Sequence, residues 1–424
     1  MTLLRVFGAL LLCLLALPAA AQGVDQPPPG SSIVASAASP SGTLKVNLTI
    51  NGEGRVGYLI SRLGKPVIAE SRLGFLFTDA PEMLRNFQVV LVAQPHRSHN
   101  ETWEEPWGEY RTIQNRYNEL TVAFQEKTWM KRRMDVVFRI YDDGVGFRYE
   151  VPRQVNFAHA SIADELTEFN VAEPGTAWWD EALEWNREEY LYRRTPIEEI
   201  GTAQTPLTIR TASGLHLSFH EAALVDYSGM DLRRVQGRTL KASLMPSSAG
   251  PKVRRDLPLA TPWRVIMIAP DAPSLYKSAQ IVLNLNEPNK LGDVSWVKPM
   301  KYVGIWWGMH LDLATWDSGP KHGATTANAK KYIDFAAKNG FGGVLIEGWN
   351  KGWDKHGDYD WFGQGYDFSF TEAYPDFDLA EVARYAKAKG VGIIGHHETA
   401  GNIANTKSNS APGSTSTESS VSTR

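Results

Sequence analysis

Three short apolar runs near the end of the chain constrain its fold more than any other feature. They are KYVGIWWGMH (301–310), FGGVLIEGWN (341–350) and VGIIGHHET (391–399). Continuous apolar runs of this length are typical of parallel strands buried on both faces. The segments between them, 325–340 and 376–390, carry apolar residues at helical spacing. A strand–helix–strand–helix–strand order predicts a parallel α/β unit.

The second of these helices has clear end signals. Asp378 is a candidate N-cap, Glu381 three residues later completes a capping box, and Gly390 suits the position just after the helix. No GxGxxG motif follows the first run, which favours a barrel over a dinucleotide-binding fold. A closed (β/α)8 barrel needs eight strands and about 250 residues. Residues 294–405 supply three strands, so we expect a chain truncated within its barrel that does not turn over substrate by itself.

The longer part of the chain, residues 43–293, has mostly period-2 alternation. LKVNLTI (44–50) alternates, and 134–151 is typical of a hairpin turning at 142–144. Many short strands at such spacing predict an antiparallel β-super-sandwich. The segments 161–169 and 274–287 are expected to be helical interruptions. The predicted fold class is therefore multidomain β plus α/β, a β-super-sandwich followed by the first part of a (β/α)8 barrel.

The two ends of the chain differ in composition from the predicted strands and helices between them. Residues 1–21 have a charged start, an apolar run of about twelve residues and an Ala-rich cleavage site, as a secretory signal peptide does. Because the only cysteine, Cys13, lies within it, the mature chain has no disulfide. Residues 22–42 are expected to be a flexible leader, and the Ser/Thr-rich residues 406–424 a disordered tail. We expect a secreted, periplasmic protein without a membrane anchor after cleavage.

Charge and aromatic content narrow the possible ligands. A net charge of −3 with mixed signs gives no footprint for nucleic acid. Seven of the 14 tryptophans lie between residues 296 and 361. Large rings there fit either a barrel core or a sugar-binding site, and the sequence leaves both interpretations open. The oligomeric state is not indicated.

Polar residues follow the predicted strands where a barrel carries its catalytic groups. Glu347, Trp349 and Asn350 follow the second strand, and His396 and Glu398 follow the third. Two carboxylates at one rim are what sugar hydrolysis needs, and the other residues could contact the substrate. Alternatively, each carboxylate caps a loop or pairs with an arginine. A zinc site at HHET is disfavoured, because the motif is not HExxH and adjacent strand residues point in opposite directions.

Five segments together resemble glycoside hydrolase family 97. They are NREEYLYRRTPIEEI, KYVGIWWGMH, KHGATTANAKKYIDFAAKNGF, LIEGWNKGW and GHHETAGN, and the similarity spans roughly residues 30–405. The resemblance implies a β-super-sandwich, a catalytic barrel and a calcium-dependent α-glucosidase or α-galactosidase. It also implies that Glu398 is a catalytic base, that Glu189 is a Ca²⁺ ligand, and that Glu347 and His396 contact the substrate.

Three functions are compatible with these features. The first is calcium-dependent hydrolysis of terminal α-glycosidic bonds of oligosaccharides, most readily α-glucosides. The second is a non-catalytic glycan-binding protein or an inactive relic of such an enzyme. The third, a lyase-like or scaffold role for the sandwich alone, is disfavoured because the barrel motifs carry the specificity.

Overall fold

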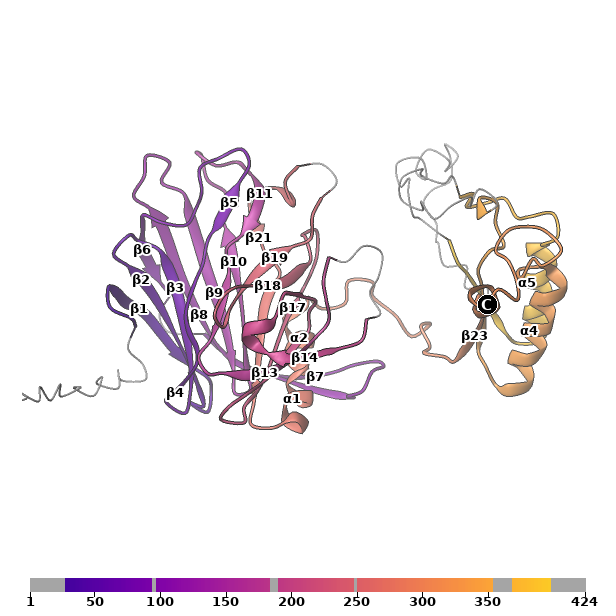
Figure 1. The fold of residues 1–424 in the computed structure, drawn as a ribbon, viewed down its shortest axis with the longest axis horizontal. Coiled ribbons are helices and arrows are strands. Elements are labelled where there is room, and N and C mark those ends of the chain that lie inside the picture. The colour runs from indigo at the N-terminus through magenta and orange to yellow at the C-terminus, as the bar shows by residue number, and fades with distance from the viewer. Residues whose placement is uncertain (1–26, 94–96, 184–189, 248–249, 354–367, 398–424) are drawn as a thin grey trace, which may run out of the picture. The chain divides into compact units, whose positions relative to one another are not determined.

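The computed structural model describes residues 27–93, 97–183, 190–247, 250–353 and 368–397. The chain divides into two compact units, residues 1–290 and residues 291–424 (Figure 1). We call them the sandwich unit and the barrel unit, and each is described by itself. Within the described ranges, no helix has the length and apolar character that crossing a bilayer requires.

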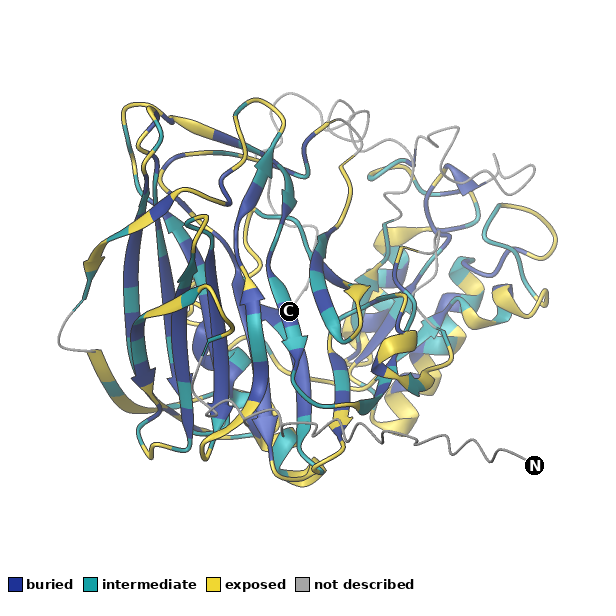
Figure 2. Ribbon diagram, turned by 60° about the vertical axis from the view of Figure 1, so that its left-hand side comes forward, coloured by how far each residue is buried: buried dark blue, intermediate teal, exposed yellow. Residues whose placement is uncertain are grey.

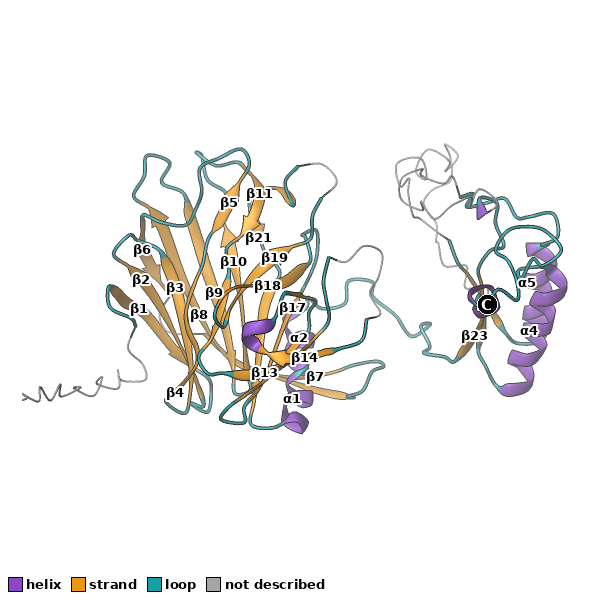
Figure 3. Ribbon diagram, in the orientation of Figure 1, coloured by secondary structure: helices purple, strands orange, loops and turns teal. Residues whose placement is uncertain are grey.

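The sandwich unit consists mainly of antiparallel strands (Figure 3). Its strands are β1 Ser31–Ala38, β2 Leu44–Asn51, β3 Val56–Arg62, β4 Lys65–Arg72, β5 Phe75–Phe77, β6 Phe87–Val92, β7 Arg97–Glu104, β8 Thr112–Glu126, β9 Arg133–Tyr141, β10 Gly144–Val151, β11 His159–Glu165, β12 Glu168–Val171, β13 Gly175–Trp179, β14 Arg193–Pro196, β15 Thr202–Ala203, β16 Leu207–Thr211, β17 His216–Ala222, β18 Met230–Gln236, β19 Thr239–Leu244, β20 Val253–Asp256, β21 Leu259–Ala260 and β22 Trp263–Ala269. A 3-10 turn, Ile197–Glu199, and two short helices, α1 Ala272–Ser278 and α2 Gln280–Leu285, complete it.

These strands form an 8-stranded sheet, β1-β2-β3-β4-β12-β19-β18-β15, and an 11-stranded sheet along β14-β13-β16-β17-β22-β10-β9-β8-β6. A smaller sheet has the order β20-β11-β5. The two large sheets share one core: Tyr58 of β3 contacts Phe147 of β10, with ring centroids 4.9 Å apart. Phe169 and Phe219 meet in the same way at 5.6 Å. Buried and exposed positions alternate along many strands (Figure 2), as expected when one face of each sheet packs inward.

Several sequence predictions are confirmed here. The 134–151 hairpin is β9 and β10, with Phe138 opposite Phe147. Residues 44–50 lie in β2, where Leu44, Val46 and Leu48 are fully buried. The helical prediction over 274–287 corresponds to α1 and α2.

Two predictions in this unit are wrong. The flexible leader predicted over 22–42 contains strand β1, which pairs with β2 from Ser31 opposite Asn51 to Ala38 opposite Lys45. Pairing with β2 outweighs the weak intrinsic strand preference of the small residues in this segment. The helix predicted over 161–169 is instead the end of β11 and the start of β12.

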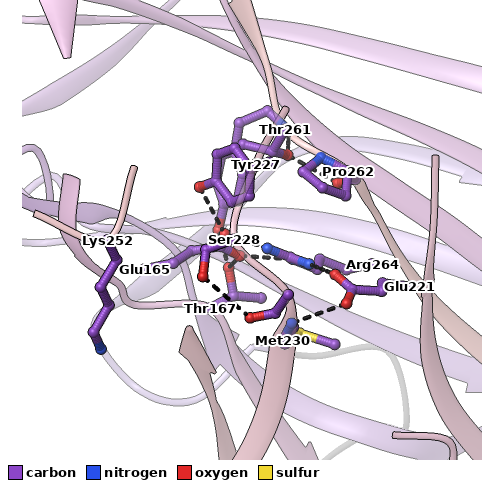
Figure 4. A network of polar contacts seen from close by, with 12 residues as sticks. Glu165, Thr167, Glu221, Tyr227, Ser228, Met230, Lys252, Thr261, Pro262 and Arg264 are labelled. Carbon is purple, nitrogen blue, oxygen red and sulfur yellow. Dashed lines mark hydrogen bonds and ion pairs between the residues drawn. The ribbon is translucent and has the colours of Figure 1, made fainter. Parts of the chain in front are cut away.

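A cluster of buried charges, which we call the Arg264 cluster, joins β11, β17 and β22 (Figure 4). The Arg264 guanidinium is 0% exposed and donates to both oxygens of Glu165 at 2.9 and 2.6 Å, and to Glu221 at 2.6 Å. Thr167 and Tyr227 also donate to Glu165 through their hydroxyl groups. Burial alone lowers the pKa of Arg264, but the two carboxylates outweigh it and raise the pKa. The cluster ties the small sheet to the 11-stranded sheet.

In its described residues, the barrel unit contains three parallel strands in the order β23-β24-β25, as predicted. They are Tyr302–Ile305, Gly343–Ile346 and Gly392–Gly395, and the helices are α3 Trp307–His310, α4 Thr326–Asn339 and α5 Leu379–Ala388. Asp378 caps α5 by accepting from the backbone N–H of Glu381, and Gly390 has φ of 70° just after the helix. The Glu381 side chain pairs with Lys330 and Arg384, so the reciprocal half of the predicted capping box is replaced by ion pairs.

Candidate active site

The ends of β24 and β25 bring Glu347 and His396 to one edge of the parallel sheet. The strands are paired in register, with Ile346 opposite Gly395. The backbone N–H of Glu347 donates to Ile305 of β23 at 3.4 Å, and that of His396 donates to Ile346 at 3.1 Å. Both residues are half-buried. The carboxyl edge of a parallel sheet is where α/β proteins place their reactive groups.

Glu347 is oriented by a tryptophan from a distant loop. The indole Nε1–H of Trp316 donates to Oε1 of Glu347 at 2.8 Å. Trp316 itself stacks on Trp353 with ring centroids 6.1 Å apart and an interplanar angle of 14°. This contact leaves Oε2 of Glu347 available for a second donor, such as a sugar hydroxyl.

Trp349 and Asn350, which are predicted to contact the substrate, are both buried side chains. Trp349 is 5% exposed and packs on Phe377, while its Nε1–H donates to the carbonyl of His396 at 2.9 Å. Asn350 is 0% exposed, accepting from Trp353 and donating to the carbonyl of Ser369. Both side chains hold the strand-end loops together, and their contact with a substrate stays a prediction.

The turn between Glu347 and Trp349 is fixed by His322, whose side chain is 0% exposed. Its Nε2 lies 3.0 Å from the carbonyl oxygen of Gly348, and its Nδ1 lies 2.7 Å from Oδ2 of Asp376. The two ring nitrogens thus link the Gly348 carbonyl to the Asp376 carboxyl group. This arrangement sets the direction in which Glu347 leaves the strand.

Aromatic side chains surround the strand ends. Trp307 is 58% exposed, and its ring meets that of Trp306 edge-on at 5.3 Å. The His310 ring contacts Trp316 at 5.1 Å. Exposed rings beside a carboxylate offer the flat apolar surfaces on which pyranose rings can stack.

The other predicted site residues, Glu398 and Glu189, lie outside the described residues. His397, the neighbour of Glu398, is half-buried, and burial lowers its pKa, with a smaller contribution from His396. Among the residues with described positions, no group of three or more His, Cys, Asp or Glu side chains could hold a metal ion.

Two supporting residues were not predicted. Trp316 belongs to the tryptophan-rich stretch, but nothing in its spacing distinguishes it from its neighbours. His322 is a lone histidine in a loop, and its partner Asp376 is 54 residues away. Such contacts depend on the tertiary fold and leave no periodic signal.

A large β-sandwich followed by parallel β/α units, with a carboxylate and tryptophans at the strand ends, defines the class of protein: this is the arrangement of a glycoside hydrolase with an N-terminal β-sandwich. The chain belongs to glycoside hydrolase family 97. Residues 37–288 match the Glycosyl-hydrolase 97 N-terminal model, and residues 306–415 match the Glycoside hydrolase 97 model.

Known relatives agree with this assignment. The chain is 24% identical over 393 residues to a retaining alpha-galactosidase of Bacteroides thetaiotaomicron, covering 85% of this chain and 55% of the relative. It is similar to the structure of a family 97 enzyme from Pseudoalteromonas sp. strain K8 in complex with panose, at 47% identity and a TM-score of 0.82. That match covers 88% of this chain and 56% of the other, so the chain spans about half the length of these relatives.

Proposed function

We propose that this protein hydrolyses terminal α-glycosidic bonds of oligosaccharides. The observation that carries the proposal is the pairing of β24 with β25, which brings Glu347 and His396 to one sheet edge. Glu398 follows His396 by two residues in the chain. Glycoside hydrolysis requires two catalytic carboxyl groups near one rim, and we propose that Glu398 is one of them.

Each residue has a proposed role. Glu398 acts as the base, taking a proton from the attacking water as the glycosidic bond breaks. Glu347, held by Trp316, accepts a hydrogen bond from a sugar hydroxyl, and His396 donates or accepts beside it. A second carboxylic acid must protonate the leaving oxygen, and we assign it to none of the residues named here.

We propose an α-glucoside as the preferred substrate. The Pseudoalteromonas enzyme, at 46–47% identity, was solved with panose and with acarbose. Panose is built from glucose alone. The alpha-galactosidase relatives are more distant, at 24–25% identity.

Calcium dependence is a further part of the proposal. Carboxylate oxygens suit a hard cation, and Glu189 is the ligand that the family resemblance selects. Leu191 and Tyr192, two and three residues further on, are themselves 92% and 69% exposed. No catalytic step is assigned to the ion.

Export to the periplasm also belongs to the proposal, with residues 1–21 as a cleaved signal peptide. Amino-terminal sequencing of the protein recovered from a periplasmic extract tests this directly. A mature chain beginning at Gln22 supports it, and an intact Met1 in that fraction contradicts it.

The activity is tested with aryl α-glucoside and aryl α-galactoside, with and without added calcium. In a version of the protein with an intact barrel, we expect faster turnover of the glucoside, and a loss of at least about 100-fold in kcat for Glu398→Gln with unchanged folding. Sugar binding without any turnover would instead support a glycan-binding protein. A loss below tenfold in Glu398→Gln would remove Glu398 from the catalytic residues.

A further inference from the structure

The sandwich unit contains a cavity of about 630 Å³ far along the chain from the barrel motifs. Its floor is formed by β16, β17 and β22, one wall by α1 and α2, and the other by the loop from β7 to β8. On β17, Leu217 and Phe219 point into the core between the sheets, whereas Ser218 and His220 line the cavity. The cavity therefore lies on the outer face of the 11-stranded sheet, and its size is typical of small-molecule sites.

The two walls are held in place by specific contacts. Trp103 of β7 donates through Nε1 to Asn284 of α2 at 2.8 Å, and Asn284 in turn donates to the carbonyl of Gln114 in β8 at 2.9 Å. The hydroxyl of Tyr276 in α1 donates to the carboxylate of Glu109 in the loop. The hairpin is thus tied to both helices, and the cavity is a preformed feature of the fold.

Neutral polar groups in the lining are left unused by the protein. The side chains of Thr208, Ser218 and Gln280 make no hydrogen bond to any other described residue. The Tyr110 hydroxyl and Nδ1 of His220 are also without a hydrogen-bond partner within the described ranges. Hydroxyl, amide and imidazole groups of this kind can both donate and accept.

The charge of the lining excludes one class of ligand and favours another. No lysine or arginine lines the cavity, and burial lowers the pKa of His220, so the lining carries no cation near neutral pH. The carboxylates of Glu105 and Glu109 stand on the loop side. An anionic ligand is therefore disfavoured, whereas a neutral ligand rich in hydroxyl groups would find acceptors on that wall and donors on the floor.

Apolar surface completes the lining. Leu275, Val282, Leu283 and Met267 line it, and the Tyr110 and Tyr276 rings lie 6.3 Å apart at an angle of 46°. A pyranose has both an apolar face for rings and hydroxyl groups for polar partners. We propose that this cavity binds a neutral mono- or disaccharide as a second carbohydrate site, on the sandwich unit and independent of the strand-end site.

The experiment uses the whole chain labelled with ¹³C at the methionine methyl groups. Met267 lies in the cavity lining and is 6% exposed, whereas Met309 in the barrel unit lies beside Gly348 and is 2% exposed. Their signals are assigned with Met267→Leu and Met309→Leu. Glucose and galactose, which have no glycosidic bond to be hydrolysed, are titrated to about 50 mM, enough to saturate a site of millimolar affinity. We expect a saturable shift of the Met267 methyl signal with at least one of these sugars, whether or not the Met309 signal also shifts.

Variants separate a built site from weak surface contact. Thr208→Val keeps the shape but removes one hydroxyl, and we expect about three- to tenfold weaker binding at Met267. Tyr276→Ala removes an aromatic wall from a residue that is 57% exposed, so the fold is retained while binding weakens by about tenfold or more. Tyr302→Ala, at a tyrosine 51% exposed in the barrel unit, is the matched control and leaves the Met267 affinity unchanged.

Several results would overturn the proposal. The first is a Met267 signal that does not shift, or that shifts without saturating, with both sugars. If only the Met309 signal responds, the sugar binds only in the barrel unit. Another is unaltered affinity in both Thr208→Val and Tyr276→Ala. A Met267 response to tetramethylammonium but to neither sugar would instead identify a site for an organic cation.

Discussion

The Arg264 cluster allows a quantitative test of how the sandwich is held together. Replacing Arg264 by Met keeps much of the side-chain volume but removes three charge-assisted hydrogen bonds, of 2.9, 2.6 and 2.6 Å. Glu165 and Glu221, which are 0% and 9% exposed, are left facing each other without a cation. Removing one partner of a buried ion pair costs about 3 to 5 kcal/mol, because the remaining charge keeps its desolvation penalty.

The cost of Arg264→Met depends on pH in a predictable direction. Burial already raises the pKa of Glu221, and Arg264 acts against that rise. Without the arginine, the folded-state pKa of Glu221 rises further above its unfolded value. Folding then takes up a proton at intermediate pH, so the variant is most stable at low pH and loses stability as pH rises. The free-energy difference from the unaltered protein grows by up to about 1.4 kcal/mol per pH unit for each proton taken up.

Hydrogen exchange of peptides covering β17 and β22, measured at pH 5.5 and pH 8, gives the free energy of opening of this unit alone. We expect a loss of about 3 to 5 kcal/mol at pH 8 and a clearly smaller loss at pH 5.5. Arg133→Met is the matched control: Arg133 forms the same two-pronged contact with Asp135, at 2.7 and 2.8 Å, but is 40% exposed, so its loss stays below about 1 kcal/mol. A loss at Arg264 no larger than the control, or one equal at both pH values, would refute the reasoning.

Three further predictions concern single residues or the proposed ion. Asp231 is buried, its Oδ2 has no hydrogen-bond partner in the described structure, and burial followed by the charge of Glu221 raises its pKa to about 6. The folded state therefore prefers the protonated acid and loses stability as pH rises through 6. Asp231→Asn should raise the free energy of unfolding of the sandwich unit by about 1 to 2 kcal/mol at pH 8, and by little at pH 4, as measured by urea unfolding. At Gly348, φ is 80° and a Cβ would lie 2.9 Å from the carbonyl oxygen of Trp316, whereas at Gly340 φ is 70° and the space is open. Gly348→Ala should therefore lower the thermal midpoint more than Gly340→Ala does. Equal midpoints for the two variants would contradict this. Exhaustive chelation should lower both the thermal midpoint and any activity, with recovery on adding Ca²⁺, and unchanged values would exclude a resident calcium ion.

Most of the fold was predictable because periodicity reports which face of an element is buried. The alternation along 134–151 and the apolar runs at 341–350 and 391–399 each correspond to observed strands. Helix end signals at Asp378 and Gly390 were equally reliable, since capping is a local interaction. Strand β1 had no such signal, because its eight residues owe their conformation to pairing with β2.

The strand-end site was predictable in its location but less so in its details. Parallel strands end at a common edge, so the placement of Glu347 and His396 follows from sequence order alone. Whether a tryptophan there faces a ligand or the core does not follow, and Trp349 proved to be buried. The contact from Trp316 to Glu347 spans 31 residues and depends on the course of a loop, which carries no repeating pattern.

The error over residues 161–169 has the same physical origin as the Arg264 cluster. The acidic residues of SIADELTEF are compatible with the exposed face of a helix, since a carboxylate is rarely buried without a partner. Glu165 is nonetheless fully buried, because Arg264, 99 residues later, supplies its counter-charge. A buried ion pair makes each of its members look like a surface residue when the segments are considered separately. To find such a core from sequence, the arginine and glutamate positions of distant strands would have to be considered together. Arg264→Met tests whether the ion pair is as necessary to the stability of the sandwich unit as its geometry implies.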